Sequence, residues 1–239
     1  MKVASLLSGG KDSLYALYVV LQHGWDVKYF VSLIPERQDS WMFHSANIHL
    51  VNTIADIIGI PLVTKTTAGR KEEELNDLKI ALEGLDIDGV VSGAIASDYQ
   101  RERICKVCDE LNLRCFVPIW HKNQEMLLRY QIAAGFEIMV DHVSAEGLGK
   151  EWLGKIIDEK NVDEFIEVCR RYGINPSGEG GEFETIVLDS PLYREKLFVE
   201  DMRIRWYRDY GYCEIIKLRR KRKSVSDIPK FLHIGEKEE

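Results

Sequence analysis

The chain has 239 residues, of which 45% are hydrophobic and 30% charged, and its formal net charge is −7. This length and apolar fraction allow one large domain, or a large and a small one, and the acidic balance argues against a general nucleic-acid-binding protein. No apolar run reaches the roughly 18 residues of a membrane span, the start lacks the pattern of a secretory signal, and five cysteines without a disulfide-like spacing favour a reducing cytoplasm.

The first half of the chain alternates between short apolar runs and segments whose apolar residues recur at helical spacing. Strands are predicted at 2–7, 26–33, 62–65, 89–94 and 114–117, and helices at 12–23, 44–58, 71–85 and 97–111. Such alternation with short connections is typical of an α/β protein with helices on both faces of a parallel sheet. We therefore expect a doubly wound parallel sheet over residues 1–120.

After about Pro118 the pattern becomes less regular. Helices are expected at 124–134 and 162–172, strands at 136–143, 183–188 and 198–218 with a turn at 209–211, and a loop rich in glycine and glutamate at 177–181. We expect a smaller α+β domain over 121–223 and a polar tail over 224–239. The basic run "KLRRKRKS" is interpreted as a solvated, frayed end in preference to a segment that binds RNA or ribosomal factors.

The sequence "SGGKDS" stands between the first predicted strand and helix. Its glycines let the backbone approach a ligand closely with N–H groups turned inward, and the start of the helix adds partial positive charge. Its serines can donate hydrogen bonds and its lysine supplies a charge, whereas Asp12 either caps the helix or helps to hold Mg²⁺. The turn therefore predicts a phosphate site, formed by Ser8, Gly9, Gly10, Lys11, Asp12 and Ser13.

A second turn, "VVSGAIASD", is expected beside the first. In an open parallel sheet, ligands bind at the carboxyl ends of the strands where the strand order reverses. If the strand order is 3-2-1-4-5, strands one and four are neighbours, and Gly93 and Ala94 would then flank the phosphate site. Ser32 and Leu33, at the end of the second strand, and His44, at the start of the next predicted helix, are expected on the adenine side. For His44 an exposed position without a ligand is an equal alternative.

A Cys-x-x-Cys pair, Cys105 and Cys108, lies in the predicted helix 97–111. Both cysteines continue the apolar face of that helix, and no second such pair is available to complete a metal site. We predict a pair of packed thiols.

The turn "SGGKDS" does not fit a Walker A loop, which needs Ser or Thr directly after its lysine. It resembles the PP-loop, SGGxDS, of the ATP pyrophosphatases, which cleave ATP between the α and β phosphates. Together with "GAIASDYQRERICKVCDELNL…PIW", "VDHVSAEGLGKEWLGK" and "NPSGEGGEFETIVLDSP", the chain from Lys2 to about Pro191 resembles the diphthine–ammonia ligase (diphthamide synthase) family. The resemblance implies the PP-loop ATP pyrophosphatase fold of the HUP type.

The same resemblance implies a ligase that forms a carbon–nitrogen bond. ATP with Mg²⁺ would adenylate the carboxylate of diphthine, a modified histidine on translation elongation factor 2, and ammonia would displace AMP to give diphthamide. The expected partners are elongation factor 2 and ammonium, in the cytoplasm, without a membrane or direct nucleic-acid contact. A homodimer is one expectation for the assembly.

The glutamate-rich stretch is expected at the acceptor site. Glu182 and Glu184 are two residues apart, so on a strand they share one face, which is costly unless positive charge meets them. They would attract the quaternary ammonium of diphthine or the ammonium ion, or deprotonate ammonium, with Trp152, Phe183 or Tyr193 as an aromatic wall. The alternative is a solvated loop held by basic partners. The predicted catalytic residues are Lys11, Asp12, Glu182 and Glu184.

Two other functions stay open on the sequence. The first is ATP-dependent tRNA modification with Cys105 or Cys108 as sulfur carrier, against which the acidic charge speaks. The second is a sensor that binds adenine nucleotides without chemistry and therefore releases no pyrophosphate when acceptor and ammonium are offered.

Overall fold

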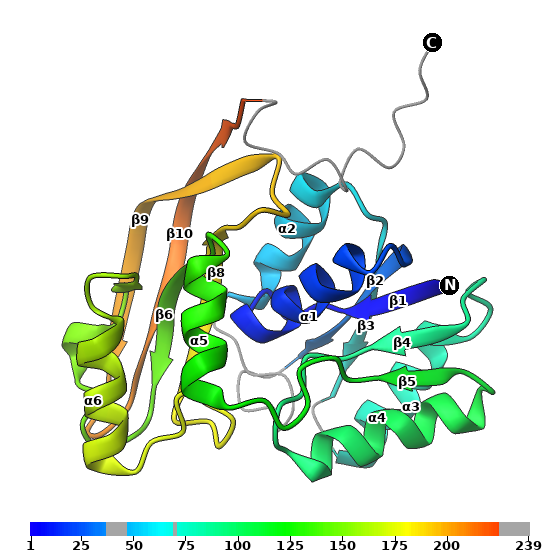
Figure 1. Ribbon diagram of the computed structural model, residues 1–239, viewed down its shortest axis with the longest axis horizontal. Coiled ribbons are helices and arrows are strands. Elements are labelled where there is room, and N and C mark those ends of the chain that lie inside the picture. The colour runs from blue at the N-terminus through cyan, green and yellow to red at the C-terminus, as the bar shows by residue number, and fades with distance from the viewer. Residues whose placement is uncertain (37–46, 69–70, 225–239) are drawn as a thin grey trace.

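The computed structural model describes residues 1–36, 47–68 and 71–224. Its first half forms a parallel sheet, on the right of Figure 1. The strands are β1 (Lys2–Leu6), β2 (Asp26–Pro35), β3 (Leu62–Thr67), β4 (Gly89–Val91) and β5 (Arg114–Phe116), in the order β3-β2-β1-β4-β5. This order meets the condition under which the two turns were expected to be neighbours, and all its pairs are parallel. It places the reversal of strand order between β1 and β4.

Helices cover both faces of this sheet. Alternate side chains of β1 point to opposite faces, so each face carries apolar residues that the helices bury. Val3 belongs to the apolar cluster that includes α1 and α2, whereas Ala4 belongs to the cluster with α3 and α4. Each large apolar side chain buried in this way stabilises the fold by about 1.5–3 kcal/mol. The predicted doubly wound fold is confirmed. The helices of this half are α1 (Lys11–Gln22), the 3₁₀ helix η1 (Ile48–Leu50), α2 (Val51–Ile58), α3 (Lys71–Leu82) and α4 (Asp98–Glu110).

The second half forms an antiparallel sheet, on the left of Figure 1. Its strands follow the order β7-β6-β10-β9, and β8 also pairs with β6. One apolar cluster runs through both halves of the chain, so the two sheets share a core. The elements are α5 (Gln124–Ala133), β6 (Glu137–Val143), the 3₁₀ helix η2 (Lys150–Trp152), β7 (Ile156–Ile157), α6 (Val162–Tyr172), β8 (Phe183–Asp189), β9 (Glu195–Trp206) and β10 (Gly211–Arg222).

The basic run near the end of the chain is part of β10 and not a frayed end, so that prediction is wrong. The strand continues to Arg222 in register with β9. Arg220 forms ion pairs with Glu195 at 2.5 Å and with Asp56 at 2.6 Å. Acidic residues on β9 and α2 lie beside this run and offset its charge. The linear sequence does not indicate this pairing, because these residues are distant along the chain.

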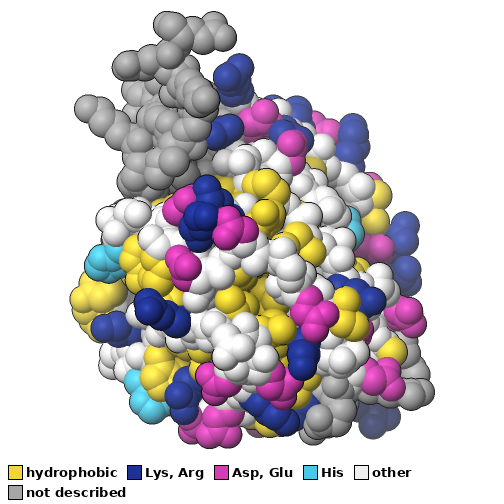
Figure 2. All heavy atoms as spheres, turned by 90° about the vertical axis from the view of Figure 1, so that its right-hand side faces the viewer, with side chains coloured by type: hydrophobic (Ala, Val, Ile, Leu, Met, Phe, Trp, Pro, Cys, Tyr) yellow, Lys and Arg dark blue, Asp and Glu magenta, His cyan; other side chains and the backbone are white. Residues whose placement is uncertain are grey.

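Figure 2 shows the side on which the N-terminus lies, where basic and acidic side chains are intermixed. Lys2 and Asp86 form an ion pair at 2.6 Å, and Lys28 and Asp26 form another at 2.7 Å. In the described parts of the chain, no helix has the length and apolar character needed to cross a membrane.

Candidate active site

The turn between β1 and α1 is closed by its own hydroxyl groups. Ser8 Oγ donates to Ser13 Oγ at 3.0 Å, and Ser13 Oγ donates to the Gly10 carbonyl at 3.0 Å. Gly9 has φ +84°, which an L side chain rarely adopts. Within the described ranges, the N–H groups of Gly9, Asp12 and Ser13 donate no hydrogen bond. These donors at a helix start suit an anion such as phosphate.

Lys11 does not face solvent, because its side chain is only 3% exposed. Its Nζ donates to the Ser177 carbonyl at 2.6 Å and to Asp12 at 2.7 Å. Its backbone N–H donates to Thr185 Oγ1 at 3.3 Å. Lys11 therefore joins the first turn to the glutamate-rich loop, and a phosphate entering the turn competes with Ser177 and Asp12 for its charge.

Asp12 is held from two sides. Lys11 binds one carboxylate oxygen, and Gln131 Nε2 on α5 donates to the other at 2.9 Å. Burial raises the pKa of the Asp12 carboxyl, although Lys11 and Gln131 oppose the shift. Asp12 does not cap α1, since the helix begins after Gly10 with no side-chain cap. Of the two predicted roles, capping is wrong and metal binding stays a prediction.

The turn after β4 packs directly on the start of α1, as the sheet order predicts. A Cβ on Gly93 would lie 2.7 Å from both Cα and N of Ser13, so only glycine allows this approach. Ala94 follows with 5% exposure, and its N–H donates to Ser92 Oγ at 3.3 Å. Gly93 therefore lies against the backbone of the phosphate turn.

The predicted adenine side is described in part. Ser32 is 3% exposed, and its Oγ has no hydrogen-bond partner among the described residues. Leu33 packs in the core between the sheet, α3 and α4. His44 lies outside the described residues. Contact of Ser32, Leu33 and His44 with adenine stays a prediction.

Glu179 links the glutamate-rich loop to the second turn. Its Oε1 accepts hydrogen bonds from the N–H groups of Ile95 at 3.0 Å, Ala96 at 2.9 Å and Ser97 at 2.9 Å. These donors precede α4, where the helix dipole also favours a carboxylate. The loop is therefore anchored at both turns, through Glu179 and through the bond between Lys11 and Ser177.

The predicted pair of glutamates is separated by the start of β8. Glu182 precedes the strand and accepts hydrogen bonds from Gly180 N–H at 2.8 Å and Asn175 N–H at 3.3 Å, so it stabilises its own loop. Glu184 lies on β8, opposite His142 of β6. The two carboxylates do not share one strand face as expected, and their catalytic roles stay predictions.

Glu184 has an acidic neighbour, Asp141, which is fully buried. Burial raises the pKa of the Glu184 carboxyl well above its usual value, and the charge of Asp141 raises it further. Asp141 accepts a hydrogen bond from Asn47 Nδ2 at 2.8 Å. This part of the site therefore favours either a proton or a cation.

The prediction that Trp152, Phe183 or Tyr193 forms an aromatic wall at this site is wrong. Trp152, Phe183 and Tyr193 are at most 3% exposed and pack in the core. The Phe165 ring lies between Trp152 and Phe183, with ring centroids 5.0 and 5.1 Å apart. None of these rings can meet an acceptor side chain.

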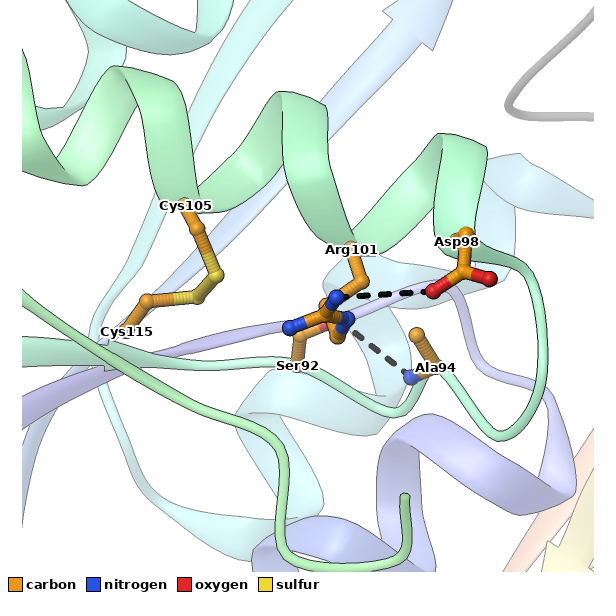
Figure 3. Close-up of a disulfide and its surroundings, with 6 residues drawn as sticks. All are labelled: Ser92, Ala94, Asp98, Arg101, Cys105 and Cys115. Atoms are coloured by element: carbon orange, nitrogen blue, oxygen red, sulfur yellow. Dashed lines mark hydrogen bonds and ion pairs between the residues drawn. A yellow bond between two sulfur atoms is a disulfide. The ribbon is translucent and has the colours of Figure 1, made fainter. Parts of the chain in front are cut away.

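Cys105 forms a disulfide with Cys115 of β5, ten residues away, and not a thiol pair with Cys108 (Figure 3). The expectation of unpaired cysteines is thus wrong for this pair, because the packing of α4 on β5 brings them together. Cys108 is fully buried, and burial raises the pKa of its thiol to about 12. Neither Cys105 nor Cys108 presents the thiolate that a sulfur carrier needs.

Two residues of the site, Gln131 and Asp141, were missed by the sequence analysis, and so was the anchoring role of Glu179. Asp141 stands as an acidic residue in the apolar strand "EIMVDHV", which is a signal that could have been used. Gln131 lies among ordinary helix formers and gives no such signal.

A glycine-containing turn with open N–H groups, at the reversal of a parallel sheet, is the arrangement of an α/β nucleotide-binding protein, and the turn sequence SGGKDS is similar to the PP-loop of the ATP pyrophosphatase class. Residues 1–115 match the model of the diphthamide synthase N-terminal domain, and residues 123–221 match that of its C-terminal domain. The chain therefore belongs to the diphthamide synthase family.

Curated relatives agree with this assignment. The diphthine–ammonia ligase of Homo sapiens is 34% identical over 227 residues, covering 85% of each chain. That of Rattus norvegicus is 36% identical over 223 residues, covering 84% of this chain and 83% of the relative. That of Danio rerio is 33% identical over 222 residues, covering 84% and 87%.

Proposed function

We propose that this chain is a diphthine–ammonia ligase, with residues 1–120 as the nucleotide-binding part and 121–223 as the acceptor-binding part. One observation carries the proposal: the phosphate turn and the glutamate-rich segment form a single site. The Val187 N–H donates to the Gly9 carbonyl at 3.1 Å, and Lys11 bonds to both Ser177 and Thr185. We include in this proposal that elongation factor 2 is the acceptor and that the reaction takes place in the cytoplasm.

In the first step, a carboxylate oxygen of diphthine attacks the α-phosphorus of ATP, and the bond to the β-phosphate oxygen breaks. The products are an acyl-adenylate and pyrophosphate. The N–H groups of Gly9, Asp12 and Ser13, with the positive end of α1, would bind the phosphates and stabilise the charge on the departing pyrophosphate.

In the second step, ammonia attacks the acyl carbon, AMP leaves, and the amide forms. Ammonia arrives mainly as ammonium at neutral pH and must lose a proton before it can attack. Glu184 suits this task, because a carboxyl with a raised pKa accepts a proton more readily near neutral pH. Glu182 and Glu179 would keep the neighbouring loop in place.

Mg²⁺ fits this site only together with the nucleotide. Among the described residues, no group of three or more His, Cys, Asp or Glu side chains could hold a metal. Mg²⁺ is often bound by one carboxylate and substrate phosphates, and the Asp12 side chain, 21% exposed, is the available carboxylate. When bound, the ion would neutralise phosphate charge.

The test combines the chain with ATP, Mg²⁺, ammonium and elongation factor 2 that carries diphthine. Pyrophosphate release and the acceptor mass are followed together. We expect both pyrophosphate and the mass change from acid to amide, and a Gly93→Ala variant should lose both. ATP binding without either signal would refute the ligase and favour the sensor.

A further inference from the structure

The disulfide between Cys105 and Cys115 joins two elements that border the proposed site. Cys105 lies on α4, and Cys115 lies on β5, which pairs with β4 (Figure 3). The bond closes a short loop, since the two cysteines are ten residues apart. It therefore fixes the position of α4 relative to the edge of the parallel sheet at one covalent point.

On the strand side, the disulfide lies close to the turn after β4. The Ser92 N–H donates to the Phe116 carbonyl at 2.9 Å, and Phe116 directly follows Cys115. Ser92 precedes Gly93, where an added Cβ would lie 2.7 Å from the backbone of Ser13. One hydrogen bond and one close backbone contact therefore connect the residues next to Cys115 with the phosphate turn.

On the helix side, Cys105 is about two turns from the start of α4. The N–H groups that precede this start, those of Ile95, Ala96 and Ser97, hold the Glu179 carboxylate. A movement of α4 changes the direction of these N–H groups, and the anchor of the glutamate-rich loop changes with them. The disulfide thus joins the elements that bound both ends of the second turn.

The two bonded cysteines differ from the other three in exposure. Cys105 and Cys115 are partly exposed, whereas Cys108, Cys169 and Cys213 are buried. Burial raises the pKa of the Cys108 thiol, one turn further along α4, to about 12. Cys108 therefore does not supply the thiolate that would attack the disulfide from within the chain, and exchange requires an external thiol.

We propose that the Cys105–Cys115 disulfide is a reversible redox site that sets the affinity of the phosphate turn for ATP. The inference rests on the proposed function, because it takes this turn as the ATP site and the cytoplasm as the compartment. Disulfides in a cytosol are usually transient because the thiol pool reduces them, whereas hyperthermophiles also carry permanent ones. In the oxidised form the second turn is held against the phosphate turn. In the reduced form only non-covalent contacts join α4 to β5, so the turn is less ordered and ATP binds more weakly.

The reductant is a dithiol. One of its thiolates attacks a sulfur of the disulfide and forms a mixed disulfide, and the other cysteine leaves as a thiolate that takes up a proton. The second thiol of the reductant then attacks the mixed disulfide and releases the remaining cysteine, while the reductant becomes an internal disulfide. Two electrons and two protons pass from the dithiol to Cys105 and Cys115, and an oxidised dithiol reverses the exchange.

The test measures the Kd of the full chain for ATP by equilibrium dialysis, in the oxidised form and after reduction with dithiothreitol. Alkylation after denaturation identifies the two forms, because it labels three cysteines in the oxidised chain and all five in the reduced one. We expect reduction to raise the Kd about twofold to thirtyfold, the range of coupling between a binding site and contacts outside it. The Tm should fall by about 5–10 °C, as expected for the loss of a cross-link over a loop of this length.

Two variants separate the bond from other effects of the reductant. Cys105→Ser and Cys115→Ser cannot form the disulfide, so both should bind ATP as the reduced wild type does, with or without dithiothreitol. A lower Tm with an unchanged Kd for ATP would mean that the disulfide is a static cross-link, and it would overturn the inference while the ligase stands. A bond that dithiothreitol does not reduce in the folded chain has the same consequence. An oxidised wild-type chain that does not bind ATP overturns the inference and the proposed function together.

Discussion

Glu179 offers a direct way to test how the glutamate-rich loop is held. In Glu179→Ala, the N–H groups of Ile95, Ala96 and Ser97 lose their shared acceptor. Ile95 is fully buried, so its N–H stays unpaired, whereas Ala96 is exposed and can bind water. An unpaired buried donor costs about 1–3 kcal/mol, and because the three lost hydrogen bonds share one charged acceptor, the upper part of this range applies.

The expected loss in the free energy of unfolding is therefore ~2–3 kcal/mol, which corresponds to a Tm about 4–12 °C lower for a chain of this size. Glu179→Gln keeps an acceptor oxygen but removes its charge, so it should lose roughly half as much. Chemical and thermal denaturation measure both values. Glu159→Ala removes an exposed glutamate that makes no such contact and should change stability by less than about 0.5 kcal/mol.

Two results would refute this reasoning. A loss in Glu179→Ala no larger than in Glu159→Ala would mean that the three N–H contacts do not hold the loop. Equal losses in the Ala and Gln variants would mean that the acceptor oxygen contributes nothing without its charge, which contradicts the intermediate loss expected for Gln.

Three further predictions concern the surrounding site. Gln131→Leu removes a hydrogen bond that lowers the pKa of Asp12, so the acid limb of the pH profile of kcat/KM should move to higher pH, and an unmoved limb contradicts the role. The pKa of Glu184 is raised in the folded state, so wild-type stability should fall as pH rises from about 4.5 through that raised pKa. Glu184→Gln should be more stable than wild type above this range and equal to it near pH 4, and a constant difference in denaturation midpoint would contradict the burial argument. Gly93→Ala forces a Cβ to 2.7 Å from Ser13, so it should cost about 1–3 kcal/mol and weaken ATP binding in calorimetry, whereas unchanged affinity would show that the two turns are independent.

The parallel, doubly wound character of the first sheet and the position of the phosphate turn could be predicted because both depend on local features. Strand and helix periodicity is set by neighbours a few residues apart, and a turn such as SGGKDS has its glycines and hydroxyls in one short segment. Once the alternation indicates a doubly wound sheet, few strand orders remain, and the tertiary structure decides among them. The family resemblance rested on the same kind of contiguous stretch.

The connections within the site were decided by the tertiary structure alone. Lys11 meets Ser177 across 166 residues, and Gln131 meets Asp12 across 119. The Cys105–Cys115 disulfide and the ion pairs of Arg220 likewise depend on which elements pack together. The sequence does not distinguish the buried aromatic residues Phe183 and Tyr193 from exposed ones such as Tyr207 and Tyr210. Only the packing of two sheets on a shared core buries the first pair and leaves the second in solvent, because burial depends on surfaces that distant parts of the chain supply.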